Sequence, residues 1–144
     1  MRAVVAVVVL LLAAGCASAR PSSSEKASCT ELYTRLQRVT AALSDTSELL
    51  TNSLGSEQLS ERIAFEEEQL RQSAQLMATA PVPDKLAATN RQLVAALQAM
   101  TGDFARAKAP AARGDFEAAS QAMSDQQAVQ HVVDASQKIE AACA

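Results

Sequence analysis

Few side chains in this chain of 144 residues could form a transition-metal site, since it has one His and three Cys. His131 belongs to no Glu-x-x-His or Cys-x-x-Cys-His motif, as di-iron helical bundles or covalently bound haem would need. The carboxylates of Glu66 to Glu68 do not converge, because consecutive helical residues point about 100° apart. No G-x-S-x-G motif or phosphate-binding loop occurs. We therefore expect no catalytic, metal or cofactor site.

The first cysteine follows an apolar N-terminal segment. Arg2 precedes an apolar run from Ala3 to Ala14, and a helix of that length rises only about 18 Å, whereas a bilayer core is about 30 Å thick. This pattern is typical of a signal peptide rather than a membrane span. Gly15 and Cys16 follow, and the segment resembles the lipobox of bacterial lipoproteins, although Ala13 stands where that family most often has Leu.

This resemblance implies that signal peptidase II cleaves between Gly15 and Cys16 and that the Cys16 sulfur carries diacylglycerol. Two or three acyl chains would anchor the protein stably in a membrane. The absence of an acidic residue directly after Cys16 favours an outer membrane, facing the periplasm, if the cell is Gram-negative. A competing interpretation is ordinary cleavage after Ala19, because Ala17-Ser18-Ala19 is a small-x-small site; it would release a soluble secreted protein.

The remainder divides into a tether and a folded domain. We expect a signal peptide at 1–15, a lipidated N-terminus with a flexible, Ser-rich linker at 16–27, and a helical domain at 28–144. Within the domain, apolar residues recur every three or four positions, which is typical of amphipathic helices. The expected helices run from Ser28 to the Gly55 cap, from Ser56 to Thr79, from Pro83 to Ala107, and from an Asp115 cap to Ala142. Ser28 to Glu31 fits a capping box, and Pro110 is expected to end the third stretch.

Three details of these helices leave alternatives open. Asn90 interrupts an apolar stripe, and either fixes the packing register or, as we favour, lies at the domain edge in water. The stripe of the last helix shifts across Gln126-Gln127, which indicates either a stutter or a kink near Ser124-Asp125. Met residues on the stripes are interpreted as core side chains rather than haem ligands; they are Met77, Met100 and Met123.

Four helices with short connections predict an all-α, antiparallel up-down-up-down four-helix bundle. Two cysteines remain once Cys16 is lipidated or removed, and an exported protein is expected to pair them. In this topology Cys29 near the start of the first helix and Cys143 at the end of the last lie at the same end of the bundle. We therefore predict a Cys29–Cys143 disulfide.

Composition also bears on function. The formal net charge is −3, so the sequence lacks the basic surface of a nucleic-acid-binding protein. We expect a non-catalytic interaction or scaffold module of the cell envelope, anchored in the membrane by acyl chains on Cys16, with an envelope protein as partner. The alternative is a carrier that holds a small apolar ligand or haem in the core.

Overall fold

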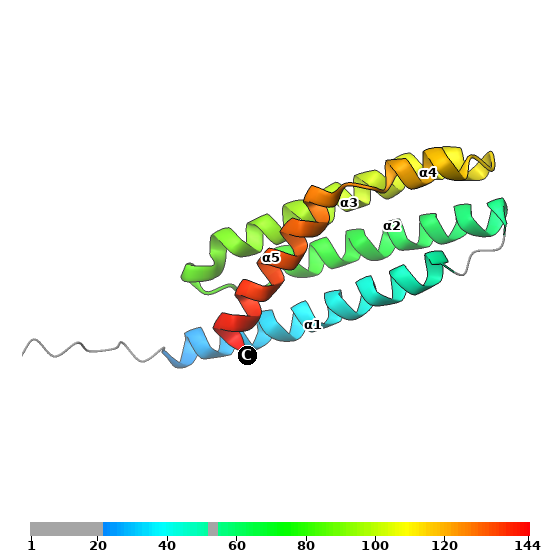
Figure 1. Cartoon of the computed structure of the whole chain (residues 1–144). Coiled ribbons are helices and arrows are strands. Elements are labelled where there is room, and N and C mark those ends of the chain that lie inside the picture. Colours follow the sequence, from blue (N-terminus) through cyan, green and yellow to red (C-terminus); the bar gives the residue numbers. More distant parts are fainter. Residues whose placement is uncertain (1–21, 52–54) are drawn as a thin grey trace, which may run out of the picture.

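The computed structural model describes residues 22–51 and 55–144 and has helices but no strands in these ranges, which confirms the all-α part of the predicted fold class. The three long helices lie side by side, and two shorter ones follow them in the chain (Figure 1). The signal peptide, Gly15, Cys16 and Ala19 lie outside the described residues, so their roles stay predictions. In chain order the elements are α1 Ser23–Thr51, α2 Ser56–Ala78, the 3-10 turn η1 Asp84–Leu86, α3 Ala87–Ala112, α4 Phe116–Ala122 and α5 Gln126–Cys143.

The first helix begins at Ser23, earlier than the expected start at Ser28. The side chain of Ser22 accepts a hydrogen bond from the backbone N–H of Glu25 at 3.1 Å, as an N-cap does. Residues 23–27 contain no Gly or Pro that would oppose a helix. The S-x-x-E pattern at Ser28 therefore lies inside the helix, and the last part of the predicted flexible linker is helical.

The third helix passes through Pro110 and ends at Ala112, beyond the predicted end at Ala107. Its end is set by Gly114, which has a φ of 76°. The Gly114 N–H donates to the Ala111 carbonyl at 3.0 Å, and the Asp115 N–H donates to the Pro110 carbonyl at 2.9 Å. This pair of bonds is a Schellman motif, so the glycine, and not the proline, ends the helix.

The predicted fourth helix is two helices, which corrects the expectation of one continuous element and favours the kink over the stutter. The chain leaves helical geometry after Ala122, and α5 begins with Asp125 as its N-cap. The Asp125 carboxylate accepts the N–H groups of Gln127 at 3.0 Å and Ala128 at 3.1 Å. The break lets α5 leave the direction of α4 and cross towards the start of α1 (Figure 1).

The core lies between α2 and α3 and is closed by α1, α4 and α5. Asn90 is buried there, and its Nδ2 donates to the carbonyl oxygen of Met77 at 3.0 Å. The edge-in-water interpretation of Asn90 is therefore wrong, since the amide joins α3 to the last turn of α2. Most of the core is small or aliphatic; the largest fully buried apolar side chains are Leu32, Val39, Ile63, Leu70, Met77, Leu93, Leu97 and Ile139.

Candidate functional site

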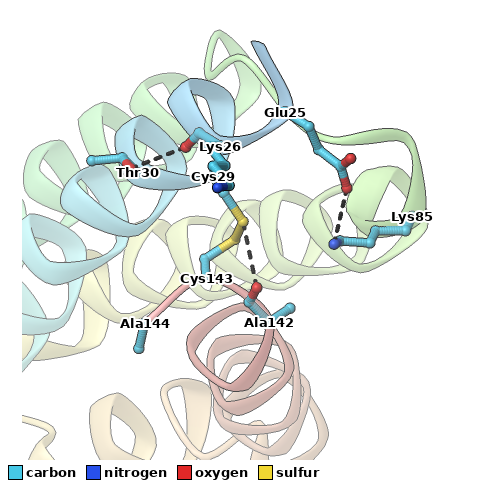
Figure 2. A pocket seen from close by; sticks show the side chains of 8 residues that line it. All are labelled: Glu25, Lys26, Cys29, Thr30, Lys85, Ala142, Cys143 and Ala144. Carbon is cyan, nitrogen blue, oxygen red and sulfur yellow. Dashed lines mark hydrogen bonds and ion pairs between the residues drawn. A yellow bond between two sulfur atoms is a disulfide. The ribbon is translucent and has the colours of Figure 1, made fainter. Parts of the chain in front are cut away.

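The two cysteines that we predicted to pair meet at one end of the domain. Cys29 on α1 and Cys143 at the end of α5 form a disulfide, with their Cα atoms 5.1 Å apart and 114 positions apart in the chain. Figure 2 shows the bond within a small pocket of about 270 Å³, and an ion pair of 2.9 Å between Lys85 and Glu25 lies beside it. The disulfide therefore fastens the last helix to the first near the point where the described chain begins.

His131 and the acidic run Glu66 to Glu68 lie in different surroundings. Within residues 22–51 and 55–144, no three His, Cys, Asp or Glu side chains gather as metal ligands would. His131 is half-buried on α5. Glu67 pairs with Lys108, and Glu68 pairs with Arg71. Glu66 is buried on α2. The three acidic neighbours thus point to different surroundings, as the helical geometry predicts.

An apolar groove of about 760 Å³ lies between α1 and α5, with α3 contributing to its lining. We call it the α1–α5 groove. It is lined by Thr40, Leu43 and Ser44 of α1, Met100 and Phe104 of α3, Met123 before α5, and Val129, Val132, Val133, Ser136, Gln137 and Glu140 of α5. Most of its surface is thus supplied by aliphatic, thioether and aromatic groups.

The α5 wall of this groove carries exposed apolar side chains. Val129 is 47% exposed and Val133 is 42% exposed, whereas Val132 between them is only 8% exposed and belongs to the core. Leaving large apolar side chains in water is unfavourable, at about 25 cal/mol per Å². Two such valines one turn apart beside an open groove therefore indicate a surface suited to binding.

The electrostatics of the groove are simple. Glu140 is the one charged side chain among its described lining residues, and it lies near the end of α5.

Next to Phe104, on the α3 side, Asp103 is buried and contacts Arg106. Burial raises the pKa of Asp103, and the charge of Asp125 raises it further, while the Arg106 guanidinium acts in the opposite direction.

Sequence reasoning placed several of these residues on apolar stripes but did not find the groove. Phe104 is buried in the core, whereas Leu43, Met100 and Met123 are only partly buried and line the groove at the core's edge. Met100 and Met123 were interpreted from the sequence as core side chains. The signal that could have shown it is Val133, which adds a second apolar row beside the stripe of α5. An apolar face wider than one seam needs a second neighbour.

No helix in the described part of the chain is both long enough and apolar enough to span a membrane. Comparisons of the chain with protein-family models, curated proteins and solved structures found no match.

Proposed function

We propose that the chain is a membrane-tethered lipoprotein of the bacterial cell envelope, and that its helical domain is a non-catalytic interaction module whose binding surface is the α1–α5 groove. The observation that carries this proposal is the open apolar groove with exposed Val129 and Val133 on its wall. Contiguous exposed apolar surface is typical of protein-binding sites. The partner is a protein of the same envelope compartment.

The proposed attachment suits the position of the groove. Acyl chains on Cys16 hold the protein at the membrane, facing the periplasm from the outer membrane in a Gram-negative cell. Thr40 lies about 25 Å along α1 from Ser23, so the α1 wall of the groove stands away from the tethered end, while the end at Glu140 lies closer to it. In this proposal α4 and α5 together take the place of the fourth helix in an up-down-up-down four-helix bundle.

The attachment is tested by the N-terminus of the mature protein. We expect mass spectrometry of the protein purified from membranes to find an acylated Cys16 as the first residue. Cys16→Ala should remove the acyl mass and release the protein from the membrane fraction. An unmodified N-terminus at Arg20 would instead establish cleavage after Ala19 and a soluble secreted protein.

The binding surface is tested by photo-crosslinking in intact cells. A photoreactive side chain at Val133 should capture an envelope protein. The same side chain at Phe65, which is 55% exposed on α2 and is not a lining residue of the groove, is the matched control. Equal capture from both positions, or none from Val133, would contradict the proposal.

A second candidate function is the carriage of a small apolar ligand in the same groove. Its volume of about 760 Å³ favours this candidate, because ligand pockets measure roughly 300–1,000 Å³. Met100 and Met123 present thioethers to the groove, and His131 is not a lining residue, so an apolar molecule suits the lining better than haem. Native mass spectrometry of the purified protein decides between the candidates, since a carrier would retain a stoichiometric small molecule.

A further inference from the structure

The α1–α5 groove has a shape and charge that favour one kind of occupant. We propose that it binds an amphipathic α-helix of about three turns, which belongs to the partner protein and carries a basic residue near its N-terminus. This inference rests on the proposed function, because it specifies the partner of the same surface.

The length of the groove follows from its α5 wall. The lining residues from Val129 to Glu140 span about 17 Å along the helix axis, which corresponds to three turns. Their spacing of three and four positions puts them on one face of α5. This face presents a ridge of side chains, against which a second helix can pack at the usual interaxial distance of about 8–10 Å.

The exposed wall favours a helix over an acyl chain. Val129 and Val133 stand at the open side, 47% and 42% exposed. Leu43, Met100 and Phe104 are less exposed than these valines, so a single acyl chain seated on them would leave the valines in water. A helix is about 10–12 Å wide with its side chains, so it can cover the valines while its own apolar residues enter the groove, as in helix-in-groove recognition.

The charges give the occupant a direction. Glu140 lies near the C-terminus of α5, where the unpaired carbonyl groups of the last turn also carry partial negative charge. The opposite end of the groove, at Met123, adjoins the N-terminus of α5. A partner helix is best accommodated with its positive N-terminal end and a Lys or Arg beside Glu140, and therefore antiparallel to α5.

The test uses two fluorescent 14-residue peptides and the full chain in lipid nanodiscs. Both peptides carry Leu at positions i, i+3, i+4 and i+7; one has Lys near its N-terminus and the other has Glu there. We expect the Lys peptide to bind about two- to fivefold more tightly by fluorescence anisotropy, as an exposed ion pair allows. Glu140→Lys should reverse this preference, because the substituted side chain then attracts the Glu peptide and repels the Lys peptide.

Substitutions in the wall provide a second arm. Val133→Asp should weaken both peptides at least tenfold, whereas Phe65→Asp on α2 is the matched control and should leave their affinity unchanged. Circular dichroism checks that each variant keeps its helix content. If Val133→Asp unfolds the domain, Glu140→Lys still tests the proposal. The side chain of Glu140 is exposed, so its substitution should leave the domain folded.

Each other outcome overturns the inference. If the two peptides bind equally tightly to the wild type and also to Glu140→Lys, then Glu140 does not orient a helix. Displacement of the peptides by one equivalent of a fatty acid would assign the groove to an acyl chain, and self-association abolished by Val133→Asp would assign it to a second copy of this chain. Failure of both peptides, combined with specific capture from Val133 in cells, would reject a helical occupant and leave the proposed function intact.

Discussion

At the scale of single residues, one buried amide joins α2 to α3. Asn90 is 6% exposed, and its Nδ2 donates to the Met77 carbonyl at 3.0 Å, a group in the last turn of α2 that also accepts the Ala80 N–H at 3.2 Å. Among the described residues, its Oδ1 has no hydrogen-bond partner. Asn90 thus donates a hydrogen bond to a carbonyl group at the end of α2, while its own amide oxygen is buried without a hydrogen bond.

We expect Asn90→Ala to lower the free energy of unfolding by about 1 kcal/mol, because a buried hydrogen bond is lost while the unsatisfied amide oxygen is removed with it. Urea denaturation followed by circular dichroism measures the change. Gln98→Ala, at an exposed position of the same helix, serves as control and should shift stability by less than about 0.5 kcal/mol. A similar loss in both variants would contradict a specific role for Asn90.

Asp103 should make stability depend on pH. Burial raises the pKa of this carboxyl above its ordinary value of 3.8, so the folded chain holds the proton at pH values where the unfolded chain has released it. Stability therefore falls as pH rises from the ordinary pKa through the raised one. Asp103→Asn should remove this decline, and its advantage over the wild type should grow from acidic to neutral pH in thermal unfolding curves.

Arg106→Gln provides the opposite change at the same site. The Arg106 charge lowers the pKa of Asp103, so its removal should extend the pH range over which the protein loses stability. The ion pair itself contributes little, because the Arg106 side chain is 66% exposed. An Asp103→Asn variant with the same pH profile as the wild type would show that the carboxyl is not effectively desolvated.

At the scale of elements, the ends of the helices depend on particular backbone positions. Gly114 has a φ of 76°, where a side chain is strained. Gly102 lies inside α3 at an ordinary helical φ, and a Cβ there would meet only the end of the Arg106 side chain, at 3.5 Å. We expect Gly114→Ala to destabilise the fold by about 1 kcal/mol, and Gly102→Ala to stabilise it by up to about 1 kcal/mol.

The two glycine variants are compared by chemical denaturation under one condition. Amide hydrogen exchange should further show faster exchange in the last turn of α3 and the start of α4 in Gly114→Ala only. Destabilisation of similar size in both variants would mean that the Schellman motif does not set the end of α3.

The sequence predicted the helices better than it predicted their ends and their packing. The three-and-four spacing of apolar residues located α2 to within one residue at its C-terminus, because that periodicity reflects burial. It missed the start of α1 at Ser23 and the passage of α3 through Pro110, which depend on local caps that several residues could supply. The groove escaped prediction because apolar residues on α5 show that a face is suited to packing, but not whether a neighbouring helix covers all of it.

At the scale of the whole molecule, α5 is capped at one end and fastened by a covalent bond at the other. Asp125 caps its N-terminus, and the Cys29–Cys143 disulfide fastens its C-terminus to α1. Between these points α5 packs on α3 and α1 and forms the exposed wall of the α1–α5 groove. The distance between the two walls of the groove therefore depends on a covalent bond as well as on side-chain packing.

We expect removal of this bond to cost about 4–5 kcal/mol of unfolding free energy in the chain-entropy model, because it closes a loop of 114 positions. For a domain of this size the melting temperature should fall by about 15 °C. Thermal unfolding of the full chain, with and without a dithiol reductant, measures the effect. Cys29→Ser with Cys143→Ser should melt at the temperature of the reduced wild type and should not respond to reductant. Because α5 is then free of α1 at one end, groove binding should also weaken below the melting temperature. A reduced protein that melts within about 2 °C of the oxidised one would show that packing alone holds α5 in place.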